Sequence, residues 1–102
     1  MYKKAKLKKL DQLAKHLPSV LQKMGIAQRL IEQKAVLVWA SAVGPVISKQ
    51  TVAQRIEKGI LYVAVANSVW INELTFLKAS IINKLNASIG QEVVKDIKFY
   101  LK

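Results

Sequence analysis

The chain has 102 residues, no cysteine, one histidine and a net charge of +11. This length suits one domain with a single hydrophobic core, and a composition of 52% hydrophobic and 23% charged residues is that of a globular protein. Without cysteine, disulfides and thiolate metal sites are excluded, and one histidine cannot build a metal cluster. We therefore predict no metal ion and no cofactor.

The N-terminus alternates lysine with leucine and forms no uninterrupted apolar run, which argues against a secretory signal. No apolar stretch reaches the roughly 20 residues that a membrane-spanning helix needs. We therefore expect a soluble, cytoplasmic protein that binds no membrane.

The positive charge is concentrated at the N-terminus, where residues 1–23 contain seven lysines against one acid, Asp11. The seven are Lys3, Lys4, Lys6, Lys8, Lys9, Lys15 and Lys23. Clustered lysines neutralise phosphates and release counterions, so we expect this segment to bind nucleic acid. A lysine-rich surface that only keeps a small protein soluble is the simpler reading.

Leucines at helical spacing predict an amphipathic helix with a lysine face over residues 5–24. Pro18 interrupts the pattern and can divide it into two helices. Gly25 is a suitable stop for this helix. We therefore predict a basic arm over residues 1–25 and a folded domain over residues 26–102.

A second helical pattern covers residues 26–43 and includes Trp39; Gly44-Pro45 then breaks or bends it. Beyond this point the period changes to 2, which predicts a β-hairpin with an aliphatic face and a tight turn at Lys58-Gly59. In the first strand the alternation places on one face Val52, Gln54 and Ile56. In the second strand the alternation places on one face Leu61, Val63 and Val65.

A third helical run is predicted from an N-cap at Ser68 to about Ser88, followed by Gly90 as the C-cap. Its apolar positions step by four, three, four and four, which predicts one continuous buried stripe: Trp70, Leu74, Leu77, Ile81 and Leu85. The last segment alternates again, and its apolar face comprises Val93, Ile97, Phe99 and Leu101.

The order helix, hairpin, helix, strand predicts an α+β two-layer sandwich, with two helices on one face of a three-stranded sheet and an additional basic helix in front. If the last strand lies parallel to a hairpin strand, the third helix is a right-handed crossover.

No arrangement typical of catalysis is evident, because the sequence pairs no nucleophile with a base and contains no glycine-rich phosphate loop. We predict a protein that is not an enzyme and has no small-molecule substrate. Tyr62 and Tyr100 fall on the strand face opposite the aliphatic one, beside Arg55, Lys98 and Lys102. There they can stack single-stranded bases or simply pack across strands, and the sequence favours neither account.

Together these landmarks resemble the DciA family of bacterial proteins. The first part of the family pattern matches Trp39, Val43-Gly44 and Ile47 to Thr51. Its Gly-x-Leu-x-Val-x-Val strand matches Gly59, Leu61, Val63 and Val65. The remaining landmarks match Ser68, Trp70, Leu74, Leu85-Asn86 and Ile97-Phe99. The resemblance covers residues 26–101, and we expect most of these positions to be structural, above all Trp39, Gly44, Gly59, Trp70, Leu74 and Phe99.

The resemblance implies a K-homology-like fold and a role in starting DNA replication. The implied partners are the bacterial replicative DNA helicase and single-stranded or forked DNA, and the implied activity is the promotion of helicase loading. The residues expected to bind nucleic acid are the seven N-terminal lysines with Arg55 and Lys98.

Two alternatives stay open. The first is an RNA-binding K-homology-like module that acts on ribosomal or other structured RNA. Such modules clamp RNA with a Gly-x-x-Gly loop, and the four glycines of this chain do not form one. The second is a purely structural partner protein whose charge is incidental.

Overall fold

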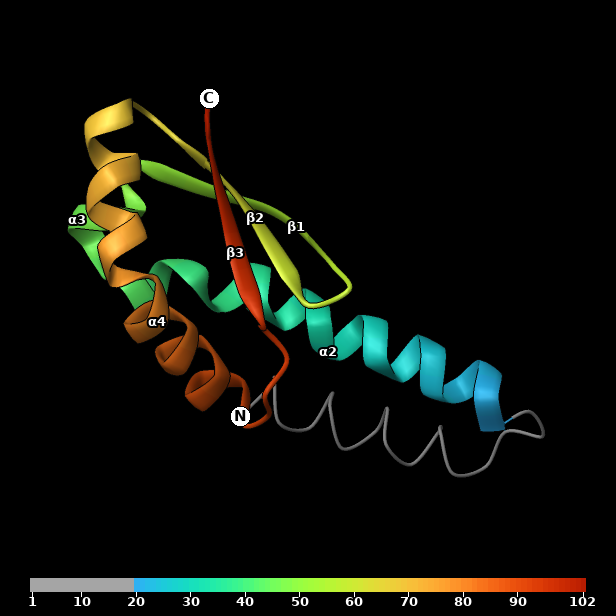
Figure 1. Cartoon of the computed structure of the whole chain (residues 1–102). Helices are drawn as coiled ribbons and strands as arrows, with labels where there is room; N and C mark the ends of the chain where they lie inside the picture. The colour runs from blue at the N-terminus through green and yellow to red at the C-terminus, as the bar shows by residue number, and fades with distance from the viewer. Residues whose placement is uncertain (1–19) are drawn as a thin grey trace. The chain divides into compact units, whose positions relative to one another are not determined.

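The computed structural model describes residues 20–102 (Figure 1). The elements in this range are α2 (Val20–Val43), α3 (Pro45–Ser48), β1 (Thr51–Glu57), β2 (Ile60–Val65), α4 (Ser68–Ile89) and β3 (Asp96–Leu101). The chain divides within α2 into two units, Met1–Ile31 and Glu32–Lys102, and the second contains the whole sheet. The predicted α+β class is confirmed. Of the predicted helix over residues 5–24, the part before residue 20 lies outside the described residues.

Helix α2 continues through Gly25, where the sequence predicted a stop. A glycine in a helix interior costs only about 1 kcal/mol relative to alanine, and the good helix formers on both sides of it outweigh that cost. The helix ends at Val43, as predicted. Gly44 follows with a φ of +87°, and Pro45 opens α3 at its first position.

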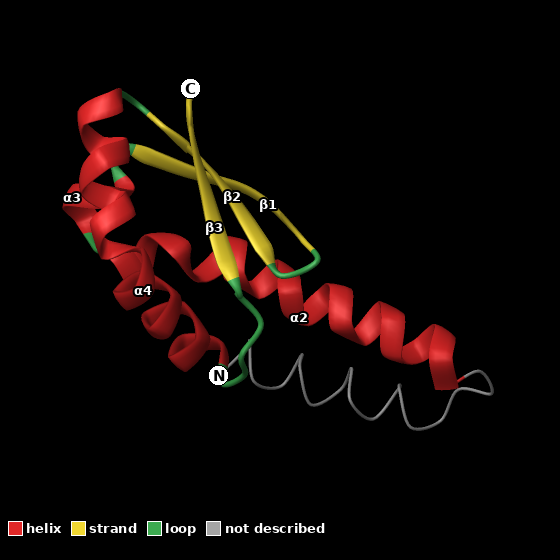
Figure 2. Ribbon diagram, in the orientation of Figure 1, coloured by secondary structure: helices red, strands yellow, loops and turns green. Residues whose placement is uncertain are grey.

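The sheet has the strand order β1-β2-β3, with β1 antiparallel to β2 and β2 parallel to β3. Figure 2 shows α4 as the crossover from the end of β2 back to the start of β3. The predicted tight turn is confirmed, because Lys58 and Gly59 both have positive φ, 51° and 81°, between the paired residues Glu57 and Ile60. Two such residues match the twist of a two-residue hairpin.

The inner face of the sheet is aliphatic, but β1 does not alternate strictly. Leu61, Val63 and Val65 of β2 are all buried. In β1 the register shifts between Ala53 and Arg55, so that Ile56 is buried and Val52 is exposed. The prediction that these two side chains share one face is therefore wrong, because a β-bulge inserts an extra residue and reverses the alternation beyond it.

Helix α4 begins at Ser68, so its N-cap lies one residue before the predicted one. The N-cap is Asn67, whose side-chain oxygen accepts a hydrogen bond of 3.0 Å from the backbone N–H of Trp70. At the other end Gly90 is the predicted left-handed C-cap, with a φ of 87°. Asn67 and Ser68 are both good capping residues, so their order alone could not decide between them.

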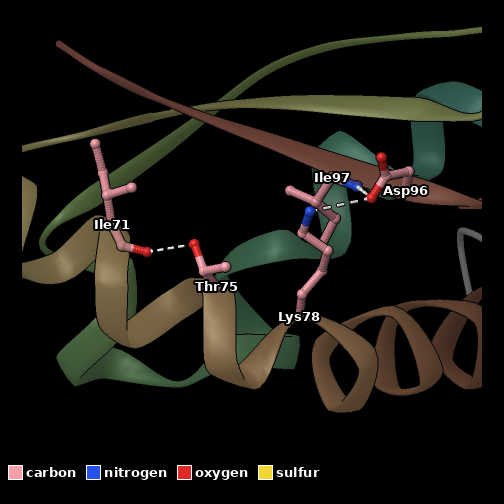
Figure 3. Close-up of polar contacts among 5 residues, drawn as sticks. All are labelled: Ile71, Thr75, Lys78, Asp96 and Ile97. Carbon is pink, nitrogen blue, oxygen red and sulfur yellow. Dashed lines mark hydrogen bonds and ion pairs between the residues drawn. The ribbon is translucent and has the colours of Figure 1, made fainter.

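The buried stripe of α4 consists of Leu74, Ile81, Leu85 and Ile89. Trp70 is only half-buried, and Leu77 is 42% exposed, which contradicts the predicted stripe. Lys78 takes the position between Leu74 and Ile81. Its stem is half-buried, and its Nζ lies 3.3 Å from Asp96 Oδ1 (Figure 3). A long basic side chain can cover apolar surface with its stem and keep its charge at the edge.

Asn86 fixes the connection between α4 and β3. Its Oδ1 accepts hydrogen bonds from the backbone N–H groups of Val93 and Val94 at 3.1 and 2.8 Å, and its Nδ2 donates to the carbonyl of Val94 at 2.9 Å. Both valines are buried, and one amide side chain provides hydrogen-bond partners for their backbone groups. The N–H of Val93 also donates a hydrogen bond of 3.0 Å to the carbonyl of Gln91.

Within residues 20–102, no helix combines the length and the apolar character that crossing a membrane requires.

Candidate nucleic-acid interface

The strands present a second face, opposite the aliphatic one, which we call the outer sheet face. It comprises Val52, Arg55, Tyr62, Ala64, Lys98 and Tyr100. The strand register arranges them in two rows. One row runs Arg55, Tyr62, Lys98, and the other runs Val52, Ala64, Tyr100. The structure therefore brings together the four candidate residues that the sequence placed on the strands.

Arg55 covers one side of the Tyr62 ring. Its guanidinium carbon lies 4.3 Å from the ring centroid, which is a cation–π contact. The same guanidinium is 3.3 Å from Glu57 Oε1 in an exposed ion pair, of the kind that contributes only about 0–1 kcal/mol. A base can reach the covered side of Tyr62 only by displacing Arg55 or by stacking on the guanidinium itself.

Tyr100 is the more accessible of the two rings. It is 38% exposed, and its neighbour across the strands is the small, buried Ala64. The sequence placed the two tyrosines on the same face with the same role. The structure separates them, because only Tyr62 stands opposite an arginine, and the register that creates this pair depends on the bulge in β1.

The outer sheet face carries little net charge. Arg55 is paired with Glu57. Within residues 24–102, the exposed Lys98 is therefore the cation of the outer sheet face that forms no ion pair. Asp96 is held by Lys78 of α4 and also accepts a hydrogen bond of 2.8 Å from the backbone N–H of Ile97 (Figure 3). The face thus offers aromatic surface rather than strong attraction for phosphates. Most of the positive charge of the chain lies elsewhere.

The predicted phosphate-binding lysines are not placed relative to this face. Lys3, Lys4, Lys6, Lys8, Lys9 and Lys15 lie outside the described residues. Lys23 lies in α2, in the unit Met1–Ile31, and its side chain is not among those described. Their role therefore stays a prediction.

Comparison with protein families now adds to this geometry. The chain matches the model of the family described as "Dna[CI] antecedent, DciA" over residues 12–99. It belongs to the DciA family. The resemblance predicted from the sequence landmarks is thus confirmed.

Similar curated proteins of the DciA family are known under the name UPF0232. One from Mycobacterium tuberculosis is 26% identical over 86 residues, which are 84% of this chain and 46% of the relative. Others from Mycobacterium leprae and Mycolicibacterium paratuberculosis are 27% identical over 86 and 77 residues, or 84% and 76% of this chain and 46% and 42% of the relatives. The chain spans about half the length of the curated relatives that it matches.

Several DciA landmarks lie away from the outer sheet face. Trp39 is 3% exposed, and its Nε1 donates a hydrogen bond of 2.8 Å to the hydroxyl of Thr51, which in turn donates one of 2.9 Å to the carbonyl of Ile47. Its ring lies 6.5 Å from that of Phe99, centroid to centroid, at an angle of 57°. These contacts connect the end of α2 with α3, β1 and β3.

The other landmarks vary in burial. Leu74 is fully buried, whereas Gly44, Trp70 and Phe99 are half-buried. Gly59 is buried, and a Cβ on it would lie 3.0 Å from the side chain of Lys95 while its φ is +81°. Any larger residue at position 59 is therefore strained both by the positive φ and by the close approach to Lys95.

Proposed function

We propose that this chain is an adaptor for the initiation of DNA replication, which binds the bacterial replicative helicase and DNA and promotes helicase loading. The observation that carries the proposal is the match to the DciA family over residues 12–99. In this proposal the protein acts in the cytoplasm without a cofactor and is not itself an enzyme. We also propose that the fold is K-homology-like. The mixed sheet and the order helix, hairpin, helix, strand support this.

DNA is bound in two ways in this proposal. The N-terminal lysines attract the phosphates of single-stranded or forked DNA. The location of most of the net charge in residues 1–23 supports this role. The outer sheet face then provides rings on which unpaired bases stack, with Lys98 and Arg55 beside them. The openness of Tyr100 supports this second contact.

The proposed mechanism is differential binding. A loader that hydrolyses no ATP can shift the helicase toward DNA only by binding more tightly to the conformation that accepts DNA. Its effect on helicase loading is therefore limited by its preference for that conformation.

The test uses the full chain and purified replicative helicase from the same bacterium. We expect direct capture of the helicase and a higher occupancy of helicase on single-stranded DNA, with no ATP turnover by the adaptor alone. Failure of the wild-type chain to capture helicase would remove the loader function. Ribosomal material, recovered from lysate and lost after nuclease treatment, would then support the RNA-binding alternative.

The outer sheet face leads to a separate prediction. Tyr100→Ala should weaken binding to single-stranded DNA by roughly five- to a hundredfold, because one base stacked on an aromatic ring contributes about 1–3 kcal/mol. Tyr62→Ala should have the smaller effect, because Arg55 already covers one side of that ring. Fluorescence anisotropy with a labelled oligonucleotide measures both variants. Val52→Ala, on the same face, is the control. Unchanged affinity in Tyr100→Ala would favour cross-strand packing as the role of the ring.

A further inference from the structure

Helix α4 carries an apolar surface on the side that faces away from its buried stripe. Phe76 is 87% exposed, Val69 is 70% exposed, and Leu77 extends the surface on one side. Glu73, also exposed, lies between Val69 and Phe76. Because residues at i, i+4 and i+7 follow one side of a helix over two turns, these four side chains form one continuous patch, which we call the Phe76 surface.

The fold does not require this surface. The helix contributes Leu74, Ile81, Leu85 and Ile89 to the core, and Phe76 points away from that stripe. A phenyl ring that is 87% exposed adds little to the buried area of the domain. Adjoining exposed apolar side chains, by contrast, are typical of protein interaction sites.

The charges around Phe76 disfavour nucleic acid as the partner. The segment from Ser68 to Leu77 contains no lysine or arginine, and its one charged residue is Glu73. Although the chain has a net charge of +11, this surface provides no cation of its own for a phosphate. Glu73 makes no ion pair within the part of the chain whose side chains are described, residues 24–102.

Pairing with a second copy of the chain is also disfavoured. Two copies of α4 that pack antiparallel through Val69 and Phe76 bring Glu73 close to its own symmetry mate. Two like charges that face each other across an apolar contact destabilise it. The complementary partner is a different protein, with an apolar pocket for Phe76 and a basic side chain within reach of Glu73.

We infer that the Phe76 surface is the docking site for the replicative helicase, through a helicase surface that combines an apolar pocket with a lysine or arginine. This inference rests on the proposed function. The surface belongs to α4, which packs on the inner face of the sheet, whereas Tyr62 and Tyr100 lie on the outer one. One molecule can therefore hold DNA and helicase at the same time.

The experiment compares variants of the full chain for affinity to purified helicase by biolayer interferometry. Phe76→Ser should weaken binding by roughly tenfold or more, as for an aromatic residue at the centre of an interface. Glu73→Lys should weaken it further than Glu73→Gln does, because it places two cations together. Val46→Ser is the matched control, since Val46 is an apolar side chain of 67% exposure on α3, and it should bind as the wild type does.

Two more measurements accompany the affinities. The melting temperature and the affinity for single-stranded DNA should not change in Phe76→Ser, because the ring contributes to neither. Equal helicase binding by Phe76→Ser and the wild type overturns the inference and leaves the proposed function standing, whereas a wild type that binds no helicase overturns the function itself. A concentration-dependent dimer that Phe76→Ser abolishes would also overturn the inference, because the surface would then bind a second copy.

Discussion

Replacement of Trp39 by alanine should lower the free energy of unfolding by about 3–5 kcal/mol, the range for truncation of a buried aromatic side chain. A small domain has only about 5–15 kcal/mol of stability in total, so this loss removes a large part of it and should lower the melting temperature markedly. Trp39 is buried, packs against Phe99 and donates its indole N–H to Thr51. Its loss leaves a cavity and takes one hydrogen-bond partner from a buried hydroxyl.

Thermal denaturation followed by circular dichroism measures this effect, and Trp70→Ala is the comparison. The sequence suggested that Trp70 is as deeply buried as Trp39. Because its side chain is in fact half-buried, the loss of stability should be clearly smaller. Equal melting temperatures for Trp39→Ala and the wild type would show that the indole is not a core anchor.

The second large effect concerns DNA. Changing Lys3, Lys4, Lys6, Lys8 and Lys9 to glutamate should abolish the retention of DNA at moderate salt and leave most of the helicase binding intact. If all five lysines contact phosphates, the slope of log K against log salt concentration should become shallower by about 3.5 for single-stranded DNA. Charge reversal is preferable to deletion of residues 1–23, because α2 already begins at Val20.

A control variant with the same net charge as the N-terminal variant tests whether the position of the lysines matters. Changing Arg29, Lys49, Lys58, Lys84 and Lys95 to glutamate removes the same charge from exposed positions elsewhere. Anisotropy titrations at several salt concentrations should show a much smaller loss of DNA binding in this control. Equal losses in both variants would mean that net charge matters and the position of the lysines does not. Loss of helicase capture only in the N-terminal variant would make the arm itself the helicase contact.

Local chemistry made the order of the elements predictable. The change of period from 3.6 to 2, the Lys58-Gly59 turn, the break at Gly44 and the cap at Gly90 all depend on residues close together in the chain, and each is present in the structure. The family could likewise be recognised from landmarks in a fixed order, because their order along the chain is itself a sequence property.

The candidate site was only partly predictable. Alternation along each strand placed Tyr62 and Tyr100 on one face, which the structure confirms. It gave no sign that Arg55 covers Tyr62, because cross-strand neighbours depend on the register. The bulge that sets this register contains no residue, such as a glycine, that would indicate it in the sequence.

Tertiary packing decided which side chains are buried. The positions of Leu77 and Lys78 both fit the spacing of the buried stripe of α4. Lys78 occupies the stripe because its ammonium group forms an ion pair with Asp96 at the start of β3. Phenylalanine is usually buried in a core, but Phe76 lies on the solvent side of the same helix. Periodicity therefore determined that a helix forms and that it has an apolar side. Which rotation of the helix meets the sheet depends on side chains distant in sequence, and so only the folded structure established it.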